Sequence, residues 1–343
     1  VYGGAHLFTR DTPAKLGRVA LALLDDFGSG LPQAARIRAK LEREPVEDYR
    51  IDFEDGYGLR SAEQEDADAQ RAAEELAALA TPPPFIGFRI RAFDEGTRER
   101  ALRTLQIFLR HLGGHAPPGF RITLPKARGA RDAADFVRAL RRAEQEFGYA
   151  TPLACEFLIE TPGAVRSVRE ILDAAEGRCA ALHFGAYDFL TACGVSAAAQ
   201  SLHHPLCDHA RAMMQLATAD WPAPVVLVDG ATNAIPARAA GAEAVRAAWD
   251  THQRDIRRSL DLGFYQSWDL HPGQIVSRYA AVYAFFRDAA PTLAAQLQHF
   301  REQGQRASVL GTDFADSANA RALELHFERG LHCGALDPGE WPA

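Results

Sequence analysis

The segment Phe157-Leu158-Ile159-Glu160-Thr161-Pro162-Gly163-Ala164-Val165 decides the fold class of this 343-residue chain. The run 153–159 that leads into it is apolar except for Glu156, which is typical of a strand buried on both faces. The run ends at a carboxylate, Glu160, and the Pro162-Gly163 step then turns the chain. The segment therefore predicts a buried parallel strand that carries an acid at its carboxyl end.

A second segment of the same design is Ala180-Ala181-Leu182-His183-Phe184-Gly185-Ala186-Tyr187-Asp188. The two predicted strands thus lead to one carboxylate each, Glu160 and Asp188. In an α/β barrel the carboxyl ends of the strands meet at one rim, where the active site lies. Two carboxylates that converge there with few other ligands are typical of a site for a hard divalent cation such as Mg²⁺.

Short apolar runs alternate with longer amphipathic stretches along most of the chain. Residues 97–112 have the apolar spacing of a helix, and residues 131–147 and 165–175 behave alike. This alternation favours parallel pairing, and eight repeats predict a closed (β/α)₈ barrel rather than an open sheet. The eight expected strands are residues 5–9, 49–53, 85–91, 120–124, 153–160, 180–184, 225–228 and 267–270.

We expect the chain to have two parts. Residues 1–276 form the catalytic barrel, and residues 277–343 form a C-terminal helical extension. The extension is too short for an independent large domain, so we expect it to pack on the barrel or on a neighbouring subunit. Residues 25–48 are interpreted as a polar insertion before the second strand, at either rim of the barrel.

Composition excludes several classes of function. Hydrophobic residues make up 47% and charged residues 24% of the chain, which is typical of a globular protein with a sizeable core. The net charge of −7 gives no support for nucleic-acid binding through a basic face. No apolar run approaches the ~20 residues of a membrane span. The five cysteines are scattered along the sequence, which favours a reducing, cytoplasmic setting.

Charged residues gather where the expected strands end. They include Glu54 and Asp55 after the second strand, Arg89 in the third, Lys126 after the fourth and Asp229 after the seventh. Burying such groups unpaired is costly, so we expect them to pair, bind a metal or face a ligand. Alternatively, Asp229 only starts a turn.

These residue types point to metal-assisted chemistry on a 2-oxo acid. Glu160 and Asp188 would bind Mg²⁺, which stabilises an enolate as a Lewis acid. The planar fork of an arginine would hold the substrate carboxylate. Arg89 is the preferred candidate, and Arg91, which has the same strand parity, is the alternative.

The remaining charged residues would complete the site. Glu54 and Asp55 would hold metal-bound waters, and Lys126 would add positive charge near the enolate. Each assignment has a structural alternative. Arg89 and Lys126 could neutralise the two acids within a buried network, and the two metal ligands could be strand-end caps. His271, which follows the last expected strand, is interpreted as a structural histidine.

A set of short motifs in a fixed order carries a resemblance to a known family. The motifs are Leu7-Phe8-Thr9-Arg10-Asp11-Thr12-Pro13, Asp52-Phe53-Glu54-Asp55, Phe88-Arg89-Ile90-Arg91, Leu124-Pro125-Lys126, Ile159-Glu160-Thr161, Phe184-Gly185-Ala186-Tyr187-Asp188-Phe189 and Leu270-His271-Pro272-Gly273-Gln274-Ile275. In this order the chain resembles the HpcH/HpaI aldolase and citrate lyase beta subunit family, and more distantly the malyl-CoA lyases and malate synthases. Each motif is weak alone, but together they span nearly the whole chain.

The resemblance implies a Mg²⁺-dependent barrel that makes or breaks carbon–carbon bonds next to a carbonyl. It implies that Arg89 binds substrate and that the segments around Glu160 and Asp188 hold the metal. Substrates of the family are often acyl-CoA thioesters paired with glyoxylate, pyruvate or oxaloacetate. Its members form trimers or hexamers in which a C-terminal acid reaches a neighbour's site, and Asp316 is the nearest match to that acid. The chain departs from the family pattern at Arg91, where Asn is usual.

The sequence therefore predicts a cytoplasmic lyase or aldolase that uses Mg²⁺, with Mn²⁺ as a substitute. Its substrate would be a 2-oxo acid or a 3-hydroxyacyl compound, with a CoA thioester possible, and its partners other copies of the chain rather than nucleic acid or membrane. One alternative is a Claisen-type enzyme that resembles malate synthase or a malyl-CoA thioesterase. An alternative of another class is a non-catalytic accessory subunit that keeps the fold.

Overall fold

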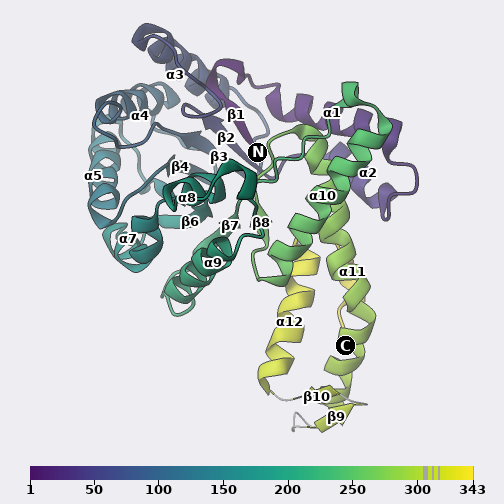
Figure 1. Ribbon diagram of the computed structural model, residues 1–343. Coiled ribbons are helices and arrows are strands. Elements are labelled where there is room, and N and C mark those ends of the chain that lie inside the picture. The colour runs from purple at the N-terminus through teal and green to yellow at the C-terminus, as the bar shows by residue number, and fades with distance from the viewer. Residues whose placement is uncertain (304–307, 311–312, 316, 343) are drawn as a thin grey trace.

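Eight parallel strands form one curled sheet with helices around it (Figure 1). The computed structural model describes residues 1–303, 308–310, 313–315 and 317–342. Each strand pairs in parallel with the next one in chain order, which confirms the (β/α)₈ barrel-like fold. The strands are β1 (Tyr2–Gly4), β2 (Asp48–Asp52), β3 (Phe85–Arg89), β4 (Phe120–Leu124), β5 (Ala154–Ile159), β6 (Cys179–Phe184), β7 (Val226–Asp229) and β8 (Gln266–Ser267).

Side-chain contacts connect the first strands of the sheet with the last one. The ring of Tyr2, in β1, stacks on Trp268, just after β8, with centroids 4.2 Å apart. Gln266 Nε2, in β8, donates a hydrogen bond of 2.9 Å to Asp48 Oδ2 at the start of β2. The first and last strands therefore meet through side chains where the sheet curls round.

Helices alternate with the strands and cover the outside of the sheet (Figure 1). Within the described residues, none of them is long and apolar enough to cross a membrane. They are α1 (Thr12–Phe27), α2 (Ala34–Arg43), α3 (Ala62–Ala77), α4 (Arg98–Leu112), α5 (Ala130–Phe147), α6 (Pro162–Arg166), α7 (Val168–Ala174), α8 (Ala186–Ala192), α9 (Pro205–Thr218), α10 (Ala242–Asp261), α11 (Pro272–Glu302) and α12 (Ser317–His332).

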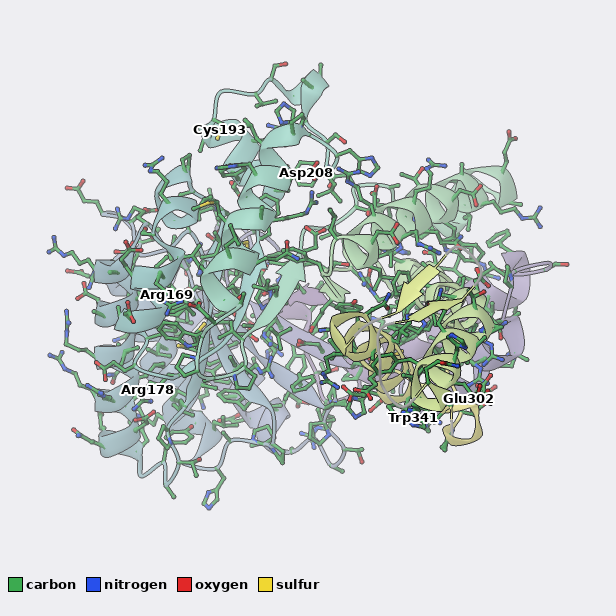
Figure 2. All side chains as sticks on the ribbon, turned by 90° about the horizontal axis from the view of Figure 1, so that it is seen from below. Arg169, Arg178, Cys193, Asp208, Glu302 and Trp341 are labelled. Atoms are coloured by element: carbon green, nitrogen blue, oxygen red, sulfur yellow. The ribbon has the colours of Figure 1, made fainter. Side chains whose placement is uncertain are left out.

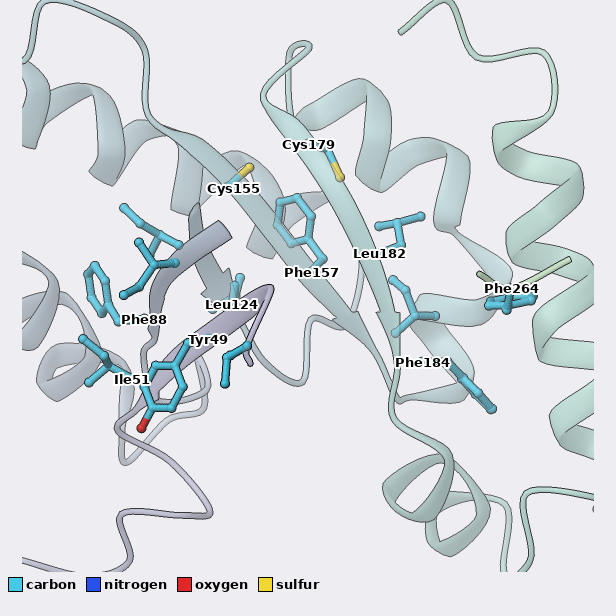
Figure 3. Close-up of a cluster of buried hydrophobic side chains, with 14 of the residues drawn as sticks. Tyr49, Ile51, Phe88, Leu124, Cys155, Phe157, Cys179, Leu182, Phe184 and Phe264 are labelled. Atoms are coloured by element: carbon cyan, nitrogen blue, oxygen red, sulfur yellow. The ribbon is translucent and has the colours of Figure 1, made fainter. Parts of the chain in front are cut away.

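The hydrophobic core lies between the sheet and these helices. Figure 3 shows side chains from neighbouring strands that project into this layer, among them Phe88, Phe157 and Phe184. Phe88 of β3 stacks on Phe108 of α4 with ring centroids 4.0 Å apart. Phe157 of β5 meets Phe136 of α5 edge-on. Burial of such rings stabilises each strand–helix unit by about 1.5–3 kcal/mol per side chain.

The other face of the sheet, which lines the barrel interior, carries polar side chains. Successive residues of a strand point to opposite faces, so Glu156 and Glu160 point inward where Phe157 points outward. Arg50 Nη2 of β2 donates to Glu156 Oε1 at 2.6 Å, and Thr123 Oγ1 of β4 donates to Glu156 Oε2 at 2.9 Å. The inside of this barrel is therefore a polar network rather than a second apolar core.

Two expected strands were placed wrongly at the ends of the barrel. The first strand is Tyr2–Gly4, and Ala5–Leu7 of the expected 5–9 is a 3-10 helix. Glycines hide the strand signal because they have no side chains. Glycine is needed at Gly4, because a Cβ there would lie 2.3 Å from Gly56 O. The last strand is only Gln266–Ser267, so it overlaps the expected 267–270 at one residue.

The expected helix 165–175 is interrupted. The structure has two short helices there, α6 and α7, which meet at Ser167 with φ −121° and ψ 31°. Ser167 Oγ donates to Gly163 O at 2.7 Å. Serine side chains compete for backbone partners in this way, which favours a break in a helix.

The polar insertion contains an amphipathic helix, α2, and lies at the rim opposite the carboxyl ends of the strands. It leads directly into the first residue of β2, and Tyr279 Oη of α11 donates to Pro45 O at 3.3 Å. Arg36 of α2 donates to Gly334 O at 3.0 Å, close to the end of the chain. The insertion therefore braces the C-terminal helices against the barrel.

The C-terminal helices extend away from the barrel (Figure 1). Strands β9 (Ser308–Leu310) and β10 (Asp313–Ala315) pair at the far end of this extension. Figure 2 places Glu302 and Trp341 together on the extension, away from Arg169 and Arg178 on the barrel. Helix α11 crosses residue 276 without a break, and the division of the chain at this residue stays a prediction.

Candidate active site

The loop after β2 and the end of β3 form one arginine–acid cluster. Arg89 donates from Nε and Nη2 to the two oxygens of Asp52, at 2.6 Å each. Its Nη1 lies 3.2 Å from Glu54 Oε2 and 3.2 Å from Asp55 Oδ2. Only 3% of Arg89 is exposed, and these acids hold the pKa of its guanidinium above the ordinary range although burial acts to lower it. The structure therefore brings together three of the site residues predicted from the sequence, Arg89, Glu54 and Asp55.

Lys126 joins this cluster from the end of β4. Its Nζ lies 3.1 Å from Glu54 Oε1 and 3.6 Å from Asp55 Oδ1. Its backbone is in the left-handed region at φ 50°, which is uncommon for a residue with a side chain. In this conformation Lys126 N donates to Glu160 Oε1 at 2.6 Å. Lys126 therefore contacts acids on both sides, by its side chain and by its backbone.

Glu160 lies at the carboxyl end of β5 with 3% of its surface exposed. Burial, and then the charges of Glu54 and Asp188, raise its pKa to about 8. Gly185 provides the room for its side chain, because a Cβ there would lie 2.3 Å from Glu160 Oε2. The structure thus holds a buried acid whose charge is opposed by two neighbouring acids and only partly offset by Arg89.

Asp188 lies in the first turn of α8, directly after β6, and is exposed to solvent. Its charge acts on both Glu160 and Lys126. The rim of the barrel therefore gathers four acids, Glu54, Asp55, Glu160 and Asp188, near Lys126 and near Arg89, whose fork Asp52 already engages.

The residues present fit a divalent cation. Within the described residues, no group of three or more His, Cys, Asp and Glu side chains is arranged to hold a metal ion. Two carboxylates with water would leave open the positions that Mg²⁺ keeps for water and substrate. Glu54 lies within 3.2 Å of both Arg89 and Lys126, yet burial outweighs these charges and raises its pKa to about 7. A cation would offset this excess of acid.

Arg91, the alternative to Arg89, is directed elsewhere. Its Nε donates to Glu65 Oε2 at 2.9 Å and its Nη2 to Gly58 O at 3.2 Å. Arg89 remains at the rim, but Asp52 takes its fork, and the third nitrogen, Nη1, lies 3.2 Å from Glu54 Oε2 and from Asp55 Oδ2. An incoming carboxylate would therefore share Nη1 with these acids. The fork geometry that we expected for the substrate is therefore used inside the protein.

Three residues of this cluster were not predicted from the sequence as site residues. Asp52 is the partner of Arg89, and the rings of Tyr2 and Trp268 lie 4.9 Å and 5.8 Å from the Arg89 guanidinium carbon. The only feature of the sequence that could have indicated Asp52 as a site residue is the run of acids in the motif at 52–55. Tyr2 comes from a strand that the apolar pattern missed, and Trp268 follows a strand of only two residues.

Two other strand-end residues have structural partners. Asp229 Oδ1 accepts from Arg211 Nε at 2.9 Å, and Asp229 Oδ2 accepts from Ser259 Oγ. His271 is the N-cap of α11, where its Nδ1 accepts from Gly273 N at 3.0 Å. Asp316 lies outside the described residues.

A protein-family model matches residues 1–343, that is, the whole chain. The chain belongs to the family described as domain of unknown function DUF6986. A search of curated proteins found no match.

Solved structures are similar to this DUF6986 chain over most of its length. A citrate lyase from Burkholderia xenovorans LB400 is 24% identical, with a TM-score of 0.66, and the match covers 89% of this chain and 90% of that one. The protein CitE from Mycobacterium tuberculosis, in complex with magnesium, acetoacetate and coenzyme A, is 19% identical, with a TM-score of 0.59 and coverage of 86% and 93%. A Haloferax volcanii malate synthase is 15% identical, with a TM-score of 0.54 and coverage of 86% and 84%. These likenesses show that the fold is citrate lyase beta-like, as the motifs predicted.

Proposed function

We propose that this protein is a Mg²⁺-dependent carbon–carbon lyase or aldolase that acts on a 2-oxo acid or a 3-hydroxyacyl substrate. The observation that carries the proposal is the buried Glu160, whose pKa is raised to about 8 by burial and by the nearby acids Glu54 and Asp188. A buried acid whose charge the protein does not balance is costly in a purely structural role. It favours a site that holds a cation during function.

In this proposal Glu160 and Asp188 hold the ion, and Glu54 and Asp55 hold its waters. The bound ion would supply a Lewis acid that stabilises an enolate next to the substrate carbonyl. Arg89 orients the substrate carboxylate through Nη1, which lies 3.2 Å from Glu54 and Asp55. Lys126 places a positive charge at the same rim. Mn²⁺ would substitute for Mg²⁺ because both prefer oxygen ligands.

The comparisons support the same class of chemistry. The solved CitE complex holds magnesium, acetoacetate and coenzyme A, and the similar enzymes from the other two organisms are described as a citrate lyase and a malate synthase. We therefore extend to this chain a small-molecule substrate, with a CoA thioester as one option. A cytoplasmic setting and a homo-oligomer, trimer or hexamer, belong to the same proposal.

The surface beside the rim bears on the CoA option. A hollow of about 940 Å³ is lined by residues 93–99 and 128–132, and it includes Arg98, Arg128 and Arg131. Arg128 already pairs with Asp132, with Nε 3.0 Å from Oδ2, and Arg98 pairs with Asp135. Because two of these arginines have acidic partners, the 2-oxo acid is the better-supported part of the proposal.

A Claisen-type enzyme that resembles malate synthase or a malyl-CoA thioesterase is the second candidate. The similar Haloferax volcanii malate synthase favours it. The two candidates differ in one product, because a thioesterase or synthase releases free CoA and an aldol cleavage leaves the thioester intact. Incubation with 3-hydroxyacyl-CoA substrates and a thiol reagent distinguishes them.

The proposal is tested by a Mn²⁺ titration followed by electron paramagnetic resonance. The native chain and Glu160→Gln are compared, with and without pyruvate, glyoxylate and oxaloacetate. We expect specific binding that is lost in the variant and a spectrum that one oxo acid perturbs. Absence of specific binding in the native chain would contradict the lyase proposal and favour the accessory subunit.

Asp316 is proposed as the acid that the C-terminal extension brings to a neighbouring site. Asp316→Ala would then lower turnover by about 100-fold or more, as expected for a general acid or base, and spare Mn²⁺ affinity. Mixed oligomers of Asp316→Ala and Glu160→Gln subunits would recover part of the activity, because each supplies what the other lacks. An unchanged rate in Asp316→Ala removes this residue from the mechanism.

A further inference from the structure

The carboxylate of Asp52 lies between the arginine and the acidic loop of the candidate site. It accepts two hydrogen bonds from Arg89, at 2.6 Å each. It also accepts from Glu54 N at 2.9 Å and from Gly56 N at 2.7 Å. Asp52 is 1% exposed. One buried carboxylate thus fixes both the Arg89 side chain and the backbone that carries Glu54 and Asp55.

The arginine is held on its other sides as well. The Tyr2 ring centroid lies 4.9 Å from its guanidinium carbon, and that of Trp268 lies at 5.8 Å. Charge-assisted pairs with two parallel hydrogen bonds fix the plane of the guanidinium. With Nε and Nη2 engaged by Asp52, Nη1 is the nitrogen that lies at 3.2 Å from both Glu54 and Asp55.

The backbone of the loop lies close to this carboxylate, and the backbone of Gly4 lies close to the loop. A Cβ on Gly56 would lie 2.8 Å from Asp52 Oδ2, and a Cβ on Gly4 would lie 2.3 Å from Gly56 O. Glycine at these two places lets the backbone approach Asp52 closely. The loop 54–56 and the Arg89 side chain therefore share one rigid support.

We infer that Asp52 is a positioning residue. It holds Arg89 so that Nη1, the nitrogen that lies beside Glu54 and Asp55, contacts the substrate carboxylate end-on. The inference rests on the proposed function and deepens it, because it states how a 2-oxo acid is recognised. A shift of about 1 Å in a positioning group can cost 100-fold in rate, so a rigid support of this kind matters for catalysis.

The chain contains a matched control for this role. Asp229, at the end of β7, is also fully buried and also holds an arginine and the backbone that follows it. It accepts from Arg211 Nε at 2.9 Å and from Gly230 N at 2.8 Å. None of these partners belongs to the proposed site. Asp52→Asn and Asp229→Asn therefore remove the same kind of charge from two buried strand ends.

The experiment measures two affinities in the native chain and in both variants. The first is the affinity for Mn²⁺. The second is the affinity of the Mn²⁺-loaded protein for the oxo acid that perturbs the Mn²⁺ spectrum. We expect Asp52→Asn to weaken oxo-acid binding by about 10-fold or more, to weaken Mn²⁺ binding less, through the loop that carries Glu54 and Asp55, and Asp229→Asn to change neither affinity. Equal losses in both variants would overturn the inference, because they would indicate general damage to a buried charge.

A double-mutant cycle with Arg89→Lys tests whether Asp52 acts through the arginine. We expect the combined loss of oxo-acid affinity to be clearly smaller than the product of the two single losses, because both substitutions disturb one unit. Independent, multiplying losses would overturn the inference. Gly56→Ala offers a milder route if Asp52→Asn does not fold, because its Cβ would displace the same carboxylate. It should also lower oxo-acid affinity, and native affinity in this variant would contradict the inference.

Failure of the proposed function gives a different result. A native chain that binds no Mn²⁺ and no oxo acid overturns the proposed function, and the positioning role falls with it. A native chain that binds both, beside an Asp52→Asn variant that binds both equally well, overturns the positioning role alone.

Discussion

Glu156 lies in β5 and Glu160 lies directly after it, four residues further on. Both point to the same side of the sheet and are buried, yet their environments differ. Glu156 accepts from Arg50 Nε and Nη2, at 2.9 Å and 2.6 Å, and from Thr123. Burial raises its pKa, but Arg50 and then His183 outweigh this and hold the pKa well below the ordinary value. Burial and neighbouring acids instead raise the pKa of Glu160 to about 8.

The difference separates a charge that the protein balances from one that it leaves unbalanced. Deep in the barrel the acid has a bidentate arginine and a hydroxyl, so its charge is balanced by the protein itself. At the rim the acid receives one backbone N–H, from Lys126, and faces two more acids. A buried charge that the fold leaves unbalanced is a candidate for ligand binding, whereas a balanced one mainly supports the fold.

The largest expected effect comes from making the same substitution at both positions. Glu156→Gln removes the buried carboxylate that pairs with Arg50, which keeps only the less buried Asp48 as an acidic partner among the described residues, so we expect a loss of about 3 kcal/mol in the free energy of unfolding. Glu160→Gln removes a charge that burial disfavours, so we expect a gain on the order of 1–3 kcal/mol at pH 8.5 without metal.

Urea unfolding at pH 8.5 measures both changes, and a Mn²⁺ titration provides the complementary test. Metal affinity should fall by more than about 100-fold in Glu160→Gln, beyond the usual effect of an outer-shell partner, and stay close to native in Glu156→Gln. A destabilised Glu160→Gln variant with intact metal binding would reverse our interpretation of the two acids.

The next effect is a dependence on pH that belongs to the rim. The folded-state pKa of Glu160, about 8, lies above the ordinary value of 4.5, so the unfolded chain releases this proton first. The contribution of Glu160 to stability is therefore complete below about pH 4.5 and is lost as pH rises toward 8. The slope is up to about 1.4 kcal/mol per pH unit.

Mg²⁺ competes with this proton, so the stabilisation by Mg²⁺ should grow as the pH rises from 6 to 8 and then level off. Thermal unfolding with and without saturating Mg²⁺ measures it, with Glu160→Gln as the control. A Mg²⁺ effect that does not change with pH, or that persists in the control, would argue that the ion binds elsewhere.

A smaller effect tests how the rim is shaped. Gly185→Ala places a Cβ 2.3–2.4 Å from atoms of Glu160, so the carboxylate must move. We expect Mn²⁺ affinity to fall by about 10-fold, in the range seen for residues that orient metal ligands. Gly96→Ala is the matched control, because a Cβ there meets nothing within 4 Å. Equal affinities in the two variants would show that Glu160 need not lie against Gly185.

The smallest effect concerns Tyr2, which connects the two regions. Its ring lies against Arg89 at the rim, and its hydroxyl lies 3.3 Å from His183 Nδ1 in the interior network. Tyr2→Phe keeps the ring, so we expect oxo-acid affinity to stay within about 2-fold and stability to fall by about 1 kcal/mol. A large loss of affinity would mean that the interior network controls the site.

Much of the fold could be predicted because the strands are locally distinctive. Apolar runs such as 120–124 and 153–160 stand out from the helical spacing around them, and the structure places β4 at Phe120–Leu124 and β5 at Ala154–Ile159. The end strands could not be found in this way. Tyr2–Gly4 has two glycines and no apolar pattern, and Gln266–Ser267 is too short to show one.

By itself the sequence determined the strand order and which acids come at strand ends, because connectivity and side-chain alternation are local properties. It therefore brought Arg89, Lys126, Glu54 and Glu160 to one rim. Only the tertiary structure decided which charges are balanced. Asp52 met an arginine from the next strand, and Glu156 met one from across the barrel. Arg91 turned to Glu65, and Glu160, among the described residues, met a backbone N–H and other acids. Partners of this kind come from distant parts of the chain, so they depend on register and packing that no local pattern records.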